Sequence, residues 1–166
     1  MRKPDLTKIK MFLADVDGTL TDGGMIYHES GDIEKKFHAH DGMAAVLLYA
    51  AGIMTGVITG AESKAVLHRA KTLGFCEIWQ AIDDKLPIVN EIASRRGLSL
   101  SEIAYIGDDI NDLEVMLAVG FSAAPSDARP EILAIADYIC KAPGGRGAFR
   151  EAADLVLKAA QAAAFD

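Results

Sequence analysis

The chain alternates short, almost continuously apolar runs with longer segments that carry helix start and stop signals. The apolar runs cover residues 10–16, 52–59, 75–80, 102–108 and 136–142. The segments with helix start and stop signals are 41–52, 61–74, 83–97, 111–120 and 126–136. Runs this continuous suit parallel strands that are buried on both faces. Strands that alternate with helices predict an α/β fold with a doubly wound, Rossmann-like and mostly parallel sheet of about five strands.

Two stretches fall outside this alternation. Residues 21–38 have the pattern of a β-hairpin around the turn-forming segment HESGD, and we expect this hairpin to project from the sheet. The C-terminal tail, 143–166, begins with a glycine-rich loop and ends in an Ala-rich helix. Residues 17–59 are already occupied by the hairpin, one helix and one strand, so no separate cap domain fits there. We therefore expect a single domain over residues 1–166.

Composition narrows the possible partners and the compartment. The chain has 166 residues, 51% of them hydrophobic, which is enough to build a core without disulfides or metals. Its formal net charge of −7 would repel nucleic acids and anionic membranes, so we expect neither as a partner. No run is long enough to span a membrane, and the first residues lack the apolar segment of a signal peptide. With Cys76 and Cys140 expected to be reduced thiols in the core, these features predict a cytoplasmic protein.

Polar residues gather where the predicted strands end. They are Asp15 and Asp17 after the first run, Thr59 and Gly60 after the second, Lys85 at the start of a helix, and Asp108 and Asp109 after the fourth run. The carboxyl ends of parallel strands share one edge of the sheet, so we expect these side chains to meet. Carboxylates so close together repel one another unless a cation lies between them. Such a site suits Mg²⁺, with Thr59 and Lys85 on the side that would hold a phosphate.

Two carboxyl groups at such a site can perform different steps of phosphate ester hydrolysis. A carboxylate that faces a metal-bound phosphoryl group can attack phosphorus and form an aspartyl phosphate. A second carboxyl group two residues on can protonate the leaving oxygen and later take a proton from the attacking water. We therefore assign Asp15 and Asp17 separate tasks.

Four motifs in order, DVDGTLTDG, VITG, Lys85 and IGDDINDLEVM, resemble those of the haloacid dehalogenase superfamily of phosphatases. The resemblance spans nearly the whole chain. The roles it implies are nucleophile for Asp15, general acid and base for Asp17, and phosphate ligands for Thr59 and Lys85. The implied Mg²⁺ ligands are the carboxylates of Asp15 and Asp108 and the carbonyl oxygen of Asp17, with Asp109 and Asp112 orienting the metal's waters or Lys85. Within the superfamily, an aspartate at position 17 favours ester hydrolysis.

Outside these motifs the chain is similar to the 3-deoxy-D-manno-octulosonate 8-phosphate phosphatases and to related phosphatases of nonulosonic acids. The similar segments are DGGMIYHESGDIEKKFHAHDG, ITGAESKAVLHRAKTLG and APGGRGAFREAADLVL. The resemblance implies a capless phosphatase of lipopolysaccharide precursor synthesis that acts on a phosphorylated sugar acid. It also implies that the hairpin assembles a homotetramer and that the tail reaches toward a neighbour's site.

Two positions depart from that family, and they leave the substrate open. Ala61 stands where the octulosonate phosphate enzymes usually carry Arg, and His40 stands where they tend to carry another Arg. The substrate-binding candidates are Gly60, Lys64, Arg69, His40 and Arg146. The alternatives are a 9-phosphorylated nonulosonic acid as substrate, a receiver-like regulatory domain and a non-catalytic oligomerisation module. Chain order disfavours the receiver, which phosphorylates an Asp after its third strand and places its Lys near the end of the chain.

Overall fold

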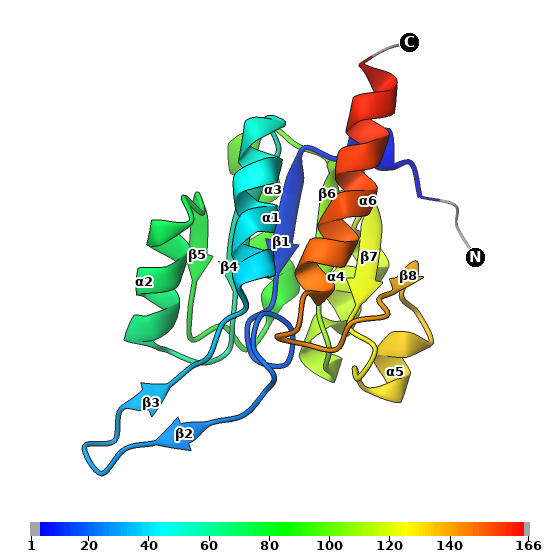
Figure 1. The fold of residues 1–166 in the computed structure, drawn as a ribbon. Coiled ribbons are helices and arrows are strands. Elements are labelled where there is room, and N and C mark those ends of the chain that lie inside the picture. Colours follow the sequence, from blue (N-terminus) through cyan, green and yellow to red (C-terminus); the bar gives the residue numbers. More distant parts are fainter. Residues whose placement is uncertain (1–3, 165–166) are drawn as a thin grey trace.

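A parallel sheet of six strands forms the centre of the structure, a computed structural model that describes residues 4–164 (Figure 1). In order across the sheet, the strands are β5 (Glu77–Trp79), β4 (Met54–Ile58), β1 (Met11–Ala14), β6 (Ile103–Ile106), β7 (Phe121–Ala124) and β8 (Tyr138–Ile139). The central strand β1 pairs in parallel with β4 on one side and with β6 on the other. The expected doubly wound, mostly parallel α/β sheet is confirmed.

The sheet has one strand more than the sequence predicted. Strand β7 has the sequence FSAA, and all four residues are buried. Small residues such as Ser and Ala are weak strand signals, so the pattern of hydrophobic positions did not reveal this strand. The helix expected over 126–136 is correspondingly short, because α5 runs only from Pro130 to Leu133.

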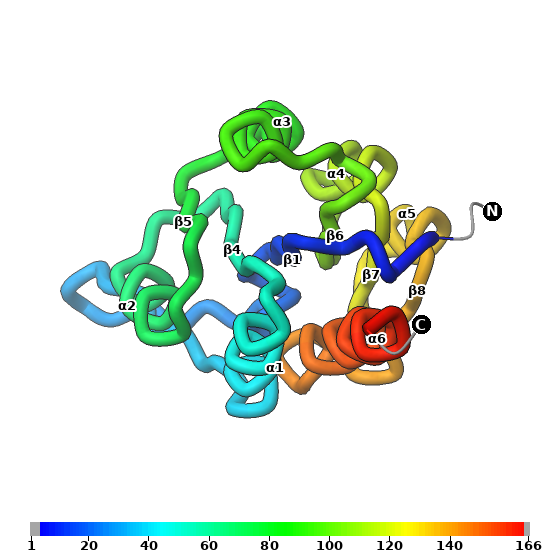
Figure 2. The backbone as a smooth tube through the Cα atoms, turned by 90° about the horizontal axis from the view of Figure 1, so that it is seen from above, coloured from blue at the N-terminus to red at the C-terminus, as the bar shows by residue number. Residues whose placement is uncertain are grey.

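Helices cover both faces of the sheet (Figure 2). On one face lie α1 (Ala39–Ala50), α2 (Lys64–Thr72) and α6 (Ala148–Ala163), and on the other lie α3 (Lys85–Arg96) and α4 (Leu113–Ala118). Three 3₁₀ segments complete the described helices: η1 (Leu6–Lys8), η2 (Leu100–Glu102) and η3 (Ile110–Asp112).

The residues of β1 alternate between the two cores that these helices form. Phe12 packs in the core that contains residues of α1 and α6, whereas Leu13 packs in the core that contains residues of α3 and α4. The ring of Phe12 lies 5.1 Å from that of Phe149 in α6, edge to face. Successive side chains of a strand point to opposite faces, so a strand between two helix layers is apolar throughout.

The predicted hairpin is present and projects from the carboxyl end of the sheet (Figure 1). Its strands are β2 (Ile26–Tyr27) and β3 (Ile33–Glu34), which pair antiparallel. Between Asp17 and Thr59 the chain forms this hairpin, α1 and β4, which leaves the end of β1 without a cap. That residues 1–166 form a single domain stays a prediction.

No described helix, from η1 to α6, is both long enough and apolar enough to cross a lipid bilayer.

Candidate active site

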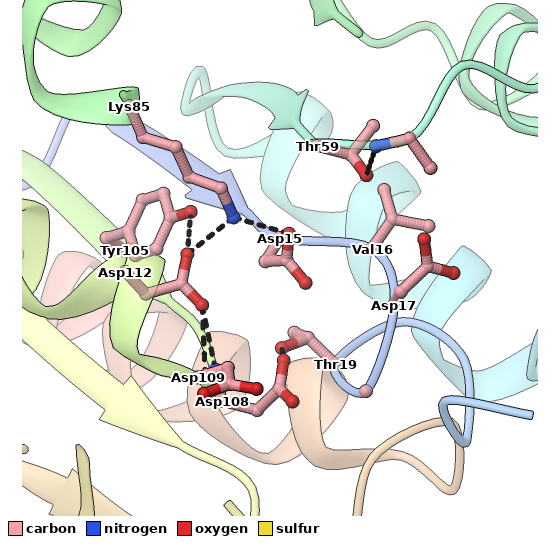
Figure 3. A network of polar contacts seen from close by, with 12 residues as sticks. Asp15, Val16, Asp17, Thr19, Thr59, Lys85, Tyr105, Asp108, Asp109 and Asp112 are labelled. Carbon is pink, nitrogen blue, oxygen red and sulfur yellow. Dashed lines mark hydrogen bonds and ion pairs between the residues drawn. The ribbon is translucent and has the colours of Figure 1, made fainter. Parts of the chain in front are cut away.

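Three neighbouring strands end together and carry the acidic and hydroxyl side chains to one place (Figure 3). Asp15 follows β1, Thr59 follows β4 and Asp108 comes two residues after β6. Lys85, the first residue of α3, enters the same space from one face of the sheet. The predicted convergence at the carboxyl edge is thus observed.

The loop after β1 packs tightly against the loop after β6. Gly18 has a φ of +91°, and a Cβ at this position would lie 2.1 Å from an oxygen of Asp108, so only glycine fits. The hydroxyl of Thr19 donates a hydrogen bond of 3.0 Å to Oδ1 of Asp108. The sequence GT after the two aspartates therefore fixes the carboxylate of the facing loop.

Lys85 supplies the positive charge at the centre of the site. Its side chain is fully buried, and Nζ lies 2.5 Å from Oδ1 of Asp15 and 2.6 Å from Oδ1 of Asp112. Burial alone would lower the pKa of Lys85, but the charges of Asp15 and Asp112 outweigh it and raise that pKa. Lys85 is therefore a permanently charged ammonium group between two carboxylates.

One lysine does not balance the negative charge around it. Burial, together with the charge of Asp112, raises the pKa of Asp15 well above its usual value despite Lys85. Burial likewise raises the pKa of Asp108, to about 6. Both shifts come chiefly from burial, and the charges of neighbouring carboxylates add to it. A bound divalent cation would supply a positive charge that favours the ionised carboxylates.

The oxygens of Asp15, Asp108 and Asp112 lie within 4.8 Å of one another, close enough to hold one metal ion. Asp112, however, is engaged on both oxygens. Its Oδ1 accepts hydrogen bonds from Lys85 and from the hydroxyl of Tyr105, which lies 2.6 Å away. Its Oδ2 accepts from the backbone N–H groups of Asp108 and Asp109, at 3.0 and 3.3 Å. Since these four donors occupy its lone pairs, Asp112 fits the expected role of orienting Lys85, and Asp15 and Asp108 fit that of ligands.

An open cleft of about 290 Å³ leads to this cluster. Its lining includes Asp15, Asp17, Thr59, Gly60, Ala61 and Asp109. The backbone N–H of Ala61 donates a hydrogen bond of 3.4 Å to the hydroxyl of Thr59. Asp109 is held in place because its carboxylate accepts from the N–H of Ile110, at 2.7 Å. The cleft therefore joins three carboxylates and a strand-end hydroxyl in a space that a small substrate could enter.

Four of the proposed substrate-binding residues lie outside this cleft. The guanidinium of Arg69 donates to the carbonyl oxygen of His38 and lies over the ring of Phe37. The ring of His40 packs edge to face on that of His38, 4.9 Å away. Lys64 lines a separate groove of about 530 Å³ beside the hairpin. Arg146 is exposed in the loop before α6. Their assignment to the substrate stays a prediction.

Two residues that contact the site were not found from the sequence. Lys35, just after β3, forms an ion pair with Asp17. Tyr105, in β6, is fully buried and donates to Asp112. Tyr105 had a detectable signal, because a tyrosine within a doubly buried strand needs a partner for its hydroxyl. Lys35 had none, since only the fold brings the hairpin base to the loop after β1.

Comparisons with known proteins find close relatives for this chain. Residues 61–147 match the family model of the haloacid dehalogenase-like hydrolases. A 3-deoxy-D-manno-octulosonate 8-phosphate phosphatase of Yersinia pestis is 38% identical over 151 residues, which cover 91% of this chain and 81% of the relative. The same enzyme of Escherichia coli K12 is 36% identical, with 91% and 80% covered.

Solved structures agree with these matches. The crystal structure of the Yersinia pestis enzyme superposes with a TM-score of 0.92 at 37% identity, covering 95% of this chain and 85% of that one. The phosphatase of Moraxella catarrhalis, in complex with a magnesium ion, a phosphate ion and the sugar acid, has a TM-score of 0.91 at 40% identity, with 98% and 96% covered.

The raised pKa of Asp108 predicts how a divalent cation changes stability with pH. Because the folded protein binds a proton at Asp108 more tightly than the unfolded chain does, protonated Asp108 adds to the free energy of unfolding. This contribution is complete below the ordinary pKa of 3.8 and is lost as the pH rises through about 6. Asp15 shifts in the same direction. Because a cation binds the ionised carboxylates, the increase in melting temperature caused by saturating Mg²⁺ should grow as the pH rises across this range.

Calorimetry with Mg²⁺ and with chelator, at a series of pH values, measures this increase. The Asp108→Asn variant is the control and should show little increase at any pH. An increase in the native protein that is equal at all pH values would contradict the account.

Proposed function

We propose a function from the premise that the chain belongs to the haloacid dehalogenase-like hydrolases, within the family of the 3-deoxy-D-manno-octulosonate 8-phosphate phosphatases. In this proposal the protein is a Mg²⁺-dependent phosphatase that hydrolyses a phosphorylated sugar acid. The observation that carries most weight is the buried Lys85 between Asp15 and Asp112, since Asp15 also lines the open cleft. Membership of a hydrolase family removes the receiver-like alternative.

Asp15 is the nucleophile in this proposal. Lys85 holds its Oδ1 at 2.5 Å, which fixes the carboxylate at the end of β1. One oxygen of Asp15 forms a bond to phosphorus, the bond between phosphorus and the ester oxygen breaks, and an aspartyl phosphate results. The residues that would hold Mg²⁺ are Asp15, Asp108 and, through its carbonyl oxygen, Asp17. When bound, the ion balances the charges of the carboxylates and the phosphate.

Asp17 is the general acid and base. Its carboxyl group gives a proton to the leaving ester oxygen, so that the sugar acid leaves as a neutral alcohol at that position. Its carboxylate then takes a proton from the water that attacks phosphorus, and Asp15 is released with inorganic phosphate. Thr59 and Lys85 hold the phosphate, through a hydroxyl group and a charged donor.

The proposed substrate is 3-deoxy-D-manno-octulosonate 8-phosphate, since the relatives with 36–38% identity act on this ester. A 9-phosphorylated nonulosonic acid is the second candidate. It is favoured by Ala61, which lines the cleft where the octulosonate enzymes usually carry a basic side chain. Cys76 and Cys140 are free thiols, in keeping with a cytoplasmic enzyme of lipopolysaccharide precursor synthesis, but only Cys140 lies in the core as expected, since Cys76 is exposed.

We also propose that the protein is a homotetramer. Large apolar side chains are exposed along the hairpin (Met25, Ile26 and Tyr27) and along one stripe of α1 (Met43, Val46 and Tyr49). Tyr27 is 67% exposed and Tyr49 is 77% exposed, and exposed apolar surfaces of this kind mark sites of protein–protein contact. Further copies of the chain would cover both surfaces and add a wall to the open cleft.

Replacing the nucleophile tests the reaction. Asp15→Asn should lower phosphate release by on the order of 10⁴-fold or more, because the amide cannot form the phosphorylated intermediate. The matched control is Asp83→Asn, which changes an exposed aspartate two residues before Lys85 and should keep full activity. Phosphate release by the folded Asp15→Asn variant at the native rate would refute the assignment.

A substrate panel tests specificity. It compares kcat/KM for the octulosonate 8-phosphate, a nonulosonate 9-phosphate and a hexose 6-phosphate, with Mg²⁺ and with chelator. We expect a sugar acid phosphate to lead and chelator to stop turnover. Ala61→Arg should then raise the preference for the octulosonate ester, because it adds a charged donor for the sugar carboxylate at the edge of the cleft. A hexose phosphate as the best substrate would contradict the proposal.

Light scattering tests the assembly. We expect four copies per particle for the native protein and fewer for Tyr27→Asp, which places a charge on the exposed apolar hairpin. The control is Leu117→Asp, since Leu117 is also exposed, at 58%, but lies on α4, over the opposite face of the sheet from α1. A monomeric native protein would disprove the tetramer.

A further inference from the structure

Lys35 is a buried residue in a hairpin whose strand β2 and turn are exposed. It follows β3 directly, and its side chain has no exposed surface. By contrast, Ile26 and Tyr27 of β2, the strand opposite, are exposed by more than half. The neighbouring Lys36 is exposed as well, at 65% of its side chain. The chain therefore turns one lysine of the pair inward, toward the catalytic loop.

Burying a lysine side chain costs free energy unless a partner balances its charge. The partner of Lys35 is Asp17, whose Oδ1 contacts Nζ in a short ion pair. The side chain of Asp17 is itself only 19% exposed. Water therefore screens the pair weakly, and the contact fixes the orientation of the carboxylate more firmly than a surface ion pair would.

We propose that Lys35 is a positioning residue for proton transfer by Asp17. This inference rests on the proposed phosphatase function. Lys35 holds Oδ1 of Asp17, so that the other oxygen, Oδ2, faces the ester oxygen of the bound substrate. A general acid must lie within hydrogen-bond reach of the atom it protonates, and a free carboxylate at the mouth of an open cleft would sample other rotamers.

Lys35 neither gains nor loses a proton in this scheme. The bond from phosphorus to the ester oxygen breaks, the electron pair stays on that oxygen, and the proton comes from Asp17. In the second step the attacking water returns a proton to Asp17, and the electron pair of the broken acyl phosphate bond returns to Asp15. The ammonium group of Lys35 donates its hydrogen bond to Oδ1 throughout.

The contact also links the hairpin to catalysis. Lys36 forms a second ion pair, of 3.0 Å, with Asp22 in the loop that follows β1. Adjacent lysines at the hairpin base thus contact the catalytic loop at two points, but only one of them reaches a carboxylate assigned to the chemistry. The two positions form a natural pair of test and control.

The test uses leaving groups that need a general acid to different degrees. A primary alkyl phosphate leaves as a strongly basic alkoxide and needs the proton, whereas p-nitrophenyl phosphate leaves as a stable phenolate and needs it little. The alkyl probe is the ester that the native enzyme hydrolyses fastest in the panel above. Rapid quench at saturating substrate measures release of each leaving group in the first turnover, before the intermediate is hydrolysed.

Lys35→Met keeps most of the length of the side chain without its charge. In this variant, first-turnover release from the alkyl ester should fall by about tenfold to a hundredfold, up to the lower end of the 10²–10⁴ that general acid–base catalysis contributes. Release of p-nitrophenolate should change by less than about threefold, because attack by Asp15 is unaffected. Lys36→Met should change neither rate. Lys35→Gln keeps a donor toward Asp17, should show a smaller loss of the same kind, and replaces the Met variant if that variant does not fold.

Three results would overturn the inference. The first is an equal fall in the first-turnover rate on the two esters, and the second is no fall on either. The third is a change confined to KM, which would make Lys35 a substrate ligand. Failure of the proposed function is separate from these, since it would appear as a native enzyme that releases phosphate from neither ester.

Discussion

The site depends on one buried ammonium group. Lys85 lies between Asp15 and Asp112 with no exposed side-chain surface, and without it two carboxylates would face each other in a poorly solvated space. Even with it, burial keeps the pKa of Asp15 and Asp108 raised. An excess of carboxylates attracts a cation, and a bound cation would in turn offset their repulsion of a phosphate.

The fold produces this arrangement by simple means. Three adjacent parallel strands end at one edge, so residues far apart in the sequence meet without any long connection. Gly18 then allows the loop after β1 to lie against Asp108, and the buried Tyr105 helps to fix Asp112 and, through it, Lys85. No cap lies between Asp17 and Thr59 in the described chain. Protection of the reaction from water therefore falls to the hairpin and to other subunits of the proposed tetramer.

Local patterns in the sequence predicted most strands and the polar residues at their ends. They did not predict contacts that depend on long-range packing. Continuous apolar runs indicated buried strands, and polar residues at the ends of three runs indicated that Asp15, Thr59 and Asp108 meet at one edge of the sheet, as the structure shows. Strand β7 was missed because Ser and Ala are weak strand signals. The contact of Lys35 with Asp17 could not be predicted, since it depends on how the hairpin folds back. For the same reason the contacts of the Arg69 guanidinium with His38 and Phe37 were not predicted, and its assignment to the substrate stays a prediction.

The central claim is that hydrolysis proceeds in two displacements at phosphorus, the first by Asp15. The stereochemical course tests this most directly, with a thiophosphate ester of the substrate that is made chiral at phosphorus by sulfur and two oxygen isotopes and is hydrolysed in water that carries the third isotope. Each in-line displacement inverts phosphorus, so a phosphorylated Asp15 predicts overall retention of configuration in the released thiophosphate. Inversion would mean that water attacks the ester in a single step, and it would contradict the account of Asp15 as nucleophile.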